Sequence, residues 1–266
     1  MSTVISHDGT LIVYDRLGEG TPLVLVDGAT GHRAFTGFSE LAQLLSSDFS
    51  VVWYDRRGRG ESTDTAPYAP EREIEDLEAI INDLGGRAFI YSISSGAVLA
   101  LEAVRRLQGK VTKLVVYEPP FVIDSSRPAL SEDYVAHLQD LLAQGRRGDA
   151  LLYFMTEAVG LPAEYAEPMR QSPQWQVLLS IAHTLPYDGT IIADTMQGNA
   201  EPLMKFAEIT APTLVLAGGE SAEWMQNAAK TIRGIIPDSR FEMLPHQTHM
   251  VSSAVLAPVL RSFFLS

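Results

Sequence analysis

The sequence predicts an α/β fold, in which a mostly parallel sheet is covered by helices and carries an inserted helical cap. Strand-like and helix-like patterns alternate up to about residue 121 and resume after about residue 212. This alternation is typical of a parallel sheet with helices on its faces. The strand-like runs are continuously apolar, as expected for strands buried on both faces. We therefore assign 1–122 and 206–266 to the core and 123–205 to the cap.

The first part of the chain predicts four strands and a helix. The Asp8-Gly9 pair between the first two runs is a strong hairpin signal. A helix is expected over Glu71–Leu84, where apolar residues recur at spacings of three and four, and Gly85-Gly86 ends it. The strands are predicted in runs rich in apolar and β-branched residues: Thr3–His7, Leu11–Arg16, Pro22–Val26 and Phe49–Tyr54.

The stretch Ser92–Gly96 is the most informative part of the chain. It follows the apolar run Ala88–Tyr91 and precedes the helix-like run Ala97–Leu101. Strand, tight turn and helix in this order are the context of a nucleophile elbow, which holds its central serine at the tip of the turn. Small flanking residues are needed because the two backbones pass close together there. Ser94 is therefore the candidate nucleophile.

The rest of the chain predicts the cap and then a return to alternation. In the cap, Ser131 and Asp149 begin helical runs, and four prolines between Pro162 and Pro186 break the remainder into short pieces. The remaining core elements are expected to be three strands and two helices: strands Lys113–Tyr117, Pro212–Ala217 and Arg240–Leu244, and helices Ala222–Ile232 and Ala254–Phe264.

Composition excludes several classes of function. The formal net charge of −13 opposes binding to nucleic acid or to an anionic membrane surface. The densest basic cluster, Arg56–Arg59, is too short for a binding tract. The chain has no cysteine, which excludes disulfides and thiolate chemistry. No secretory signal is visible, and no apolar run approaches the ~20 residues of a membrane span, so we expect a cytoplasmic protein.

Four motifs in this order resemble those of the α/β-hydrolase family, over nearly the whole chain. They are Leu23–Gly28, Tyr54–Ser62, the elbow around Ser94, and His249 before the terminal helix. The resemblance implies an eight-stranded, mostly parallel sheet with the cap inserted after the sixth strand. It also implies that Asp55–Ser62 is a structural turn supporting the elbow. That segment lacks the Gly-Lys-Ser/Thr ending of a phosphate-binding loop.

The resemblance implies a histidine base for Ser94. A serine hydroxyl is a weak nucleophile until a base takes its proton. His249 lies between the last strand and the last helix, where the family has this base. His246 is the competing histidine; it stands nearer the strand end, and we expect a structural or cap-facing role for it.

The acid of the triad departs from the family's commonest pattern, an aspartate after the seventh strand. Ser221 occupies that position, and Glu220 and Glu223 are offset from it. We choose Glu118, which ends a buried apolar strand and precedes two prolines; certain haloalkane dehalogenases and zearalenone-type lactone hydrolases carry their acid there. Sites in such sheets lie at the carboxyl ends of strands. The alternative is a structural glutamate paired with an arginine such as Arg56 or Arg57.

The resemblance also implies an oxyanion hole and a pocket wall. The backbone N–H groups of Ala29 and Ser95 would bind the oxyanion. Gly28 follows Asp27, where the family usually has histidine; an anion there would oppose catalysis, so we expect Asp27 to point away. The cap would line the pocket, with cap-to-core packing as the alternative for each of its candidates: Tyr134, Phe154, Met155, Trp175, Leu178, His183, Met196 and Met204.

The sequence thus predicts a serine hydrolase that cleaves an ester or lactone of an apolar small molecule through Ser94, His249 and Glu118. A serine nucleophile disfavours epoxide hydrolysis and dehalogenation. We expect no cofactor and no metal, because neither a dinucleotide fingerprint nor a metal-ligand spacing is present. We expect no nucleic-acid or membrane partner and leave a homodimer open. The alternatives are a lyase or perhydrolase on the same triad, and a ligand-binding receptor with little turnover.

Overall fold

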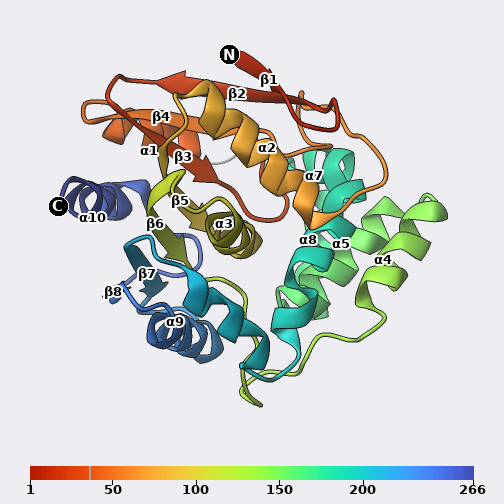
Figure 1. The fold of residues 1–266 in the computed structure, drawn as a ribbon. Helices are drawn as coiled ribbons and strands as arrows, with labels where there is room; N and C mark the ends of the chain where they lie inside the picture. The colour runs from red at the N-terminus through yellow and green to blue at the C-terminus, as the bar shows by residue number, and fades with distance from the viewer. Residues whose placement is uncertain (36) are drawn as a thin grey trace.

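The computed structural model describes residues 1–35 and 37–266, which contain one eight-stranded sheet (Figure 1). Its strand order is β1-β2-β4-β3-β5-β6-β7-β8. The pairs β1–β2 and β2–β4 are antiparallel, and every other pair is parallel. The predicted fold class is therefore confirmed. The strands are β1 (Ser2–Ile5), β2 (Leu11–Leu17), β3 (Thr21–Val26), β4 (Phe49–Tyr54), β5 (Ala88–Ile93), β6 (Val111–Tyr117), β7 (Thr213–Gly218) and β8 (Ser239–Leu244).

Helices cover both faces of the sheet (Figure 1). Successive side chains of a strand point to opposite faces. Leu23 and Leu25 of β3 accordingly pack in one buried cluster with α1 and α10, and Val24 and Val26 pack in the other with α2, α3 and α9. The core helices are α1 (Phe38–Leu45), α2 (Pro70–Asp83), α3 (Ser95–Arg106), α9 (Glu223–Ile235) and α10 (Ser253–Leu265).

Helix α1 is absent from the sequence-based predictions. It has only eight residues, and no side chain caps its N-terminus at Gly37. The local start signals on which a prediction depends are therefore missing. Its apolar positions, which include Phe38 and Leu41, become recognisable once they are seen packed against the sheet.

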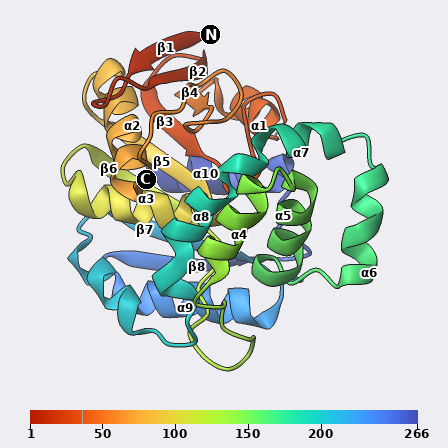
Figure 2. The ribbon, with the colours of Figure 1, turned by 90° about the vertical axis from the view of Figure 1, so that its right-hand side faces the viewer.

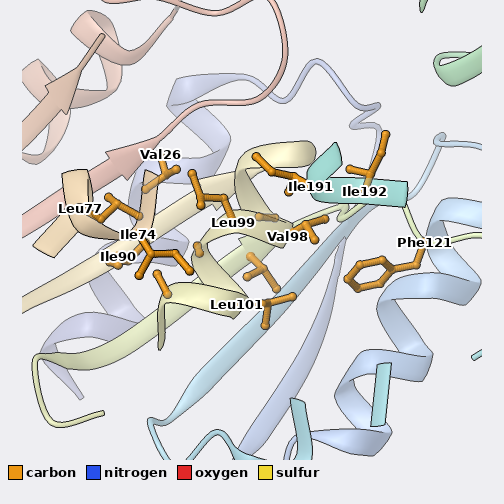
Figure 3. Close-up of a cluster of buried hydrophobic side chains, with 14 of the residues drawn as sticks. Val26, Ile74, Leu77, Ile90, Val98, Leu99, Leu101, Phe121, Ile191 and Ile192 are labelled. Carbon is orange, nitrogen blue, oxygen red and sulfur yellow. The ribbon is translucent and has the colours of Figure 1, made fainter. Parts of the chain in front are cut away.

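The described residues between β6 and β7 form helices and short turns and no strand, on one side of the core (Figure 2). Ile191 and Ile192 of α8 lie beside Val98 and Leu99 of α3 in a shared apolar cluster (Figure 3). This contact holds the α8 end of the cap against the helix that follows Ser94. The longer elements are α4 (Tyr134–Ala143), α5 (Arg147–Tyr153), a π-helical turn (Phe154–Ala158), α6 (Ala163–Ala166), α7 (Trp175–Ile181) and α8 (Leu185–Ile192), with 3-10 turns at Glu167–Gln171, Ala182–Thr184, Ala193–Met196 and Glu201–Glu208.

Candidate active site

Ser94 lies in the turn between β5 and α3, with φ 57° and ψ −135°. A non-glycine residue rarely adopts a positive φ, and such strain at a strand-to-helix turn exposes the serine oxygen above the sheet. Gly96 is required there, because a Cβ at that position would lie 2.3 Å from the Asp27 carbonyl oxygen. Ser92 is buried and donates from Oγ to the Val115 carbonyl at 3.2 Å. The neighbouring strand thus accommodates serine where the usual motif has glycine.

A fully buried carboxylate contacts His249. Glu118 follows β6 with φ 45°, and its side chain is 0% exposed. Its Oε1 accepts the Gly218 N–H at 2.7 Å, and its Oε2 lies 2.7 Å from Nδ1 of His249. This contact engages one ring nitrogen of His249 and leaves Nε2 for the cavity, which His249 and Ser94 both line.

The other candidates for acid and base lie apart from this contact. Nδ1 of His246 lies 3.1 Å from Oε1 of Glu220, and both side chains are well exposed. Glu223 is the first residue of α9, where its charge suits the positive end of the helix. Arg56, the expected partner of a structural Glu118, pairs with other carboxylates. The geometry therefore brings Glu118 to His249 and keeps Glu220 and Glu223 away from it.

The loop after β3 passes directly over Ser94. A Cβ on Gly28 would lie 2.8 Å from the Ser94 Cβ, so only glycine permits this approach. The Asp27 carboxylate is folded into its own loop: Oδ1 accepts the Gly28 N–H at 2.8 Å, and a Cβ on Gly31 would meet Oδ2 at 2.2 Å. In the described part of the chain, no hydrogen bond engages the backbone N–H of Ala29 or Ser95. Both groups are available to a ligand oxygen.

A cavity of about 420 Å³ lies over Ser94 and His249. One part of its wall comes from α1 and α10 and includes Phe38 and Leu256. The sequence analysis did not predict these two residues as part of a pocket. Another part comes from the π-helical turn of the cap and the residue after it, with Phe154, Met155 and Val159. Among the described residues that line it, none is a lysine or arginine. The cavity is therefore suited to an uncharged, largely apolar molecule.

Most of the cap residues predicted to line a pocket do not line this cavity, and this corrects the sequence-based expectation. The Tyr134 ring stacks on Tyr153, with centroids 5.4 Å apart. Trp175 packs under the Arg170 guanidinium, and His183 is half-buried elsewhere in the cap. These side chains pack inside the cap, which was the stated alternative. Leu178 and Met196 are likewise buried away from this cavity, whereas Met204 lies outside it and is 58% exposed.

A buried charge cluster joins the cap to the core behind residues 27–31, the loop that holds the proposed oxyanion donor Ala29 and is called the oxyanion loop below. Arg56 donates to both oxygens of Glu73, at 2.6 and 2.7 Å, and to Oδ1 of Asp188 in α8 at 2.7 Å. Arg59 donates to the other oxygen of Asp188, and the Ser95 hydroxyl donates to Oδ1 at 2.7 Å. Burial raises the pKa of Asp188, but the charges of Arg56 and Arg59 more than offset this and hold that pKa below its ordinary value. Asp188 is therefore a buried anion, and no sequence signal identified it.

Two further classes of feature are absent from residues 1–35 and 37–266. No group of three or more histidine, aspartate or glutamate side chains there is arranged to hold a metal ion. None of the helices formed by these residues has the length and apolar character needed to cross a membrane.

Comparisons with known proteins agree with this fold. Residues 23–258 match the model of the Alpha/beta hydrolase family. An alpha/beta hydrolase from Sphaerobacter thermophilus DSM 20745 is 48% identical, with a TM-score of 0.91 over 99% of this chain and 100% of that one. An enol-lactonase from Burkholderia xenovorans LB400 is 18% identical, with a TM-score of 0.71 over 100% of both chains. The uncharacterized hydrolase YraK of Bacillus subtilis (strain 168) is 30% identical over 115 residues, which span only 42% of each protein.

Proposed function

We propose, from the premise that this chain belongs to the α/β-hydrolase family, that it cleaves an ester or lactone of an apolar small molecule. Ser94 is the nucleophile, His249 the base and Glu118 the acid. The observation that carries this assignment is the 2.7 Å contact of Glu118 Oε2 with His249 Nδ1, beside a cavity that His249 and Ser94 share.

In the first half of the reaction, Ser94 is acylated. Its Oγ bonds to the substrate carbonyl carbon as Nε2 of His249 takes the hydroxyl proton. The carbonyl oxygen becomes an anion, which the backbone N–H groups of Ala29 and Ser95 stabilise. The bond from the carbonyl carbon to the leaving oxygen then breaks, and His249 gives its proton to that oxygen.

In the second half, water releases the acyl group. His249 takes a proton from water, whose oxygen bonds to the acyl carbon, and the bond to Ser94 Oγ breaks as Oγ recovers a proton. Throughout, Glu118 accepts the Nδ1–H of His249 and stabilises the imidazolium that forms. Because Oε1 already accepts the Gly218 N–H, the carboxylate is held in the one orientation that aims Oε2 at the ring.

The cavity wall supports the proposed substrate class. Apolar side chains from α1, α10 and the cap surround Ser94, and the described lining residues include no lysine or arginine to bind a substrate carboxylate. A volume of about 420 Å³ suits a small molecule. The fold shared with an enol-lactonase supports a lactone as one of the two options.

The proposal is tested by labelling with a fluorophosphonate and by turnover of chromogenic esters and lactones. Only an activated serine reacts with the probe, so wild type should be labelled at Ser94 and the Ser94→Ala variant should not. The matched control is Ser253→Ala, because Ser253 lines the same cavity and should not carry the label. Ester turnover by Ser94→Ala should fall by ~10³-fold or more.

Two results would contradict this function. A folded Ser94→Ala protein that keeps near-normal turnover would exclude the serine mechanism. A wild-type protein that is neither labelled nor active on any ester or lactone would favour a ligand-binding receptor.

A further inference from the structure

Arg59 contacts the oxyanion loop from behind. It lies in the turn after β4, and its side chain is 1% exposed. One terminal nitrogen donates to the Gly28 carbonyl at 2.7 Å and to the Gly31 carbonyl at 3.3 Å. The other donates to Asp188, and Nε donates to the Thr184 hydroxyl at 3.1 Å. A single guanidinium thus spans the distance from the cap to the loop over Ser94.

The Gly28 carbonyl belongs to the same peptide group as the Ala29 N–H. A peptide group is planar and this one is trans, so its C=O and N–H point in opposite directions. A donor that fixes the carbonyl therefore also fixes the direction of the N–H. The donor is charged, and a charge-assisted hydrogen bond in a buried site polarises the group that accepts it. The Ala29 N–H becomes a stronger donor on the side that faces the cavity.

Asp188 links this arrangement to the second oxyanion donor. Its Oδ2 accepts from Arg59, and its Oδ1 accepts from the hydroxyl of Ser95 at 2.7 Å. The backbone N–H of Ser95 is the other group that we assign to the oxyanion. One buried carboxylate of the cap is therefore hydrogen-bonded to the Ser95 side chain and, through Arg59, to the Gly28–Ala29 peptide.

We propose that Arg59, held by Asp188, is a positioning residue that aligns and polarises the Gly28–Ala29 peptide for the oxyanion. This inference rests on the proposed function, since it assigns a role to groups behind the same site. Neither side chain lines the cavity, so Arg59 acts through the carbonyls that it holds, and Asp188 acts through Arg59 and the Ser95 hydroxyl.

The decisive comparison is Arg59→Lys against Arg57→Lys. Lysine keeps the charge but loses the planar fork that bonds several acceptors at once. Arg57 is a matched control, because it lies in the same turn with a 0% exposed side chain and bonds both oxygens of Asp76, at 2.7 and 2.8 Å. Its other hydrogen bonds go to Asp8 and to the Arg72 carbonyl, and within residues 1–35 and 37–266 none goes to the oxyanion loop. Both variants should lower the melting temperature.

The readouts are kcat and KM for a short chromogenic ester, and Ki for an alkyl trifluoromethyl ketone, whose adduct with Ser94 carries an oxyanion. Arg59→Lys should lower kcat by ~10- to 100-fold, because removal of a whole oxyanion donor costs about 10²–10³. The Ki should rise by a similar factor, and KM should change little. Arg57→Lys should keep kcat and Ki close to wild type at a temperature where both variants are folded.

If Arg59→Lys fails to fold, Thr184→Val is the second variant, since it removes the hydroxyl that accepts from Nε of Arg59 and leaves every charge of the cluster in place. Its kcat should fall and its Ki should rise by ~3- to 10-fold. The inference is overturned if the folded variant keeps kcat and Ki near wild type, or loses no more than Arg57→Lys does. Failure of the proposed function looks different: wild type itself would then show neither inhibition by the ketone nor labelling of Ser94.

Discussion

Replacing Glu118 with glutamine should leave the fold in place and remove most of the turnover. Glutamine has the shape of glutamate, and the Gly218 N–H decides how it sits, because its carbonyl oxygen must replace Oε1 as the acceptor of that N–H. The amide NH₂ then replaces Oε2 against Nδ1 of His249. Since an NH₂ group only donates, Nδ1 must accept, and the ring proton moves to Nε2. A protonated Nε2 is unable to take the proton of Ser94.

The size of the effect follows from these two contacts. Holding the histidine in the wrong tautomer costs ~10⁴ in kcat in a serine triad, or about 5.4 kcal/mol at 1.36 kcal/mol per decade. The glutamine amide can avoid the wrong tautomer by rotating so that its carbonyl oxygen accepts the Nδ1–H of His249. Its NH₂ group then faces the Gly218 N–H. Two buried donors are left without acceptors, at about 1–3 kcal/mol each. A flip cost of about 2–6 kcal/mol gives an expected loss in kcat of ~30-fold at the low end, and the tautomer cost limits the loss to ~10⁴-fold at the high end.

The assay is kcat for a short chromogenic ester, with thermal unfolding to verify that each variant is folded. Glu220→Gln is the control, because Glu220 contacts His246 at the surface and should be dispensable. A Glu118→Gln protein within tenfold of the wild-type kcat would refute the reasoning about the tautomer. A larger loss from Glu220→Gln or Glu223→Gln would show that the acid lies after β7.

Three further variants test other parts of the structure. Phe154→Ala should cost ~1–3 kcal/mol in kcat/KM for substrates that fill the cap side of the cavity and little for a small ester. Trp175 is equally buried but lies away from the cavity, so Trp175→Ala should affect large and small substrates alike. Equal losses from the two variants would contradict the assignment of Phe154 to the cavity wall. Gly28→Ala should lower kcat by ~10²-fold or more, because the new Cβ would lie 2.8 Å from the Ser94 Cβ. Gly37→Ala is the control, since a Cβ there would lie 3.8 Å from the nearest atom, Oγ of Ser253. Similar kcat values for the two variants would show that close packing on Ser94 is not the reason for glycine at position 28. Burial lowers the pKa of His183, so its stabilising contribution is complete above about pH 6.5 and is lost as the pH falls through the pKa of the folded state. The unfolding free energy of wild type, measured in urea, should therefore decline more steeply toward about pH 5 than that of His183→Gln, and parallel curves would count against this.

Much of the candidate site is readable from the chain because its residues follow strands. Ser94 comes directly after β5 and Glu118 directly after β6, and neighbouring parallel strands bring their carboxyl ends to one edge of a sheet. Local signals are therefore enough to place them together. Asp188 has no such signal. It lies 129 residues from Arg59 and 132 from Arg56, in a helix whose sequence does not distinguish a buried aspartate from a solvated one.

The cavity wall is less predictable, for a physical reason. Phe154 lines the cavity and Trp175 packs inside the cap, yet both are buried aromatic residues of short helical segments. The apolar character of a side chain predicts that it is buried. It does not predict whether the side chain lines a cavity or packs against other side chains. Helix α1 was not predicted because it is short and uncapped, so Phe38 and Leu41 were not predicted as part of the cavity wall either.

The charge cluster has a consequence for exchanging caps between related hydrolases. Asp188 supplies the cap's half of an ion-pair network whose other half, Arg56 and Arg59, is fixed in the core. A foreign cap without a carboxylate at this point would leave guanidinium charge buried and uncompensated, which typically costs about 3–5 kcal/mol. A cap transplanted with new pocket residues but without this aspartate should therefore yield an unstable chimera, whatever substrate its wall was chosen to fit. In this protein the cap and the core are exchangeable only as an electrostatically matched pair.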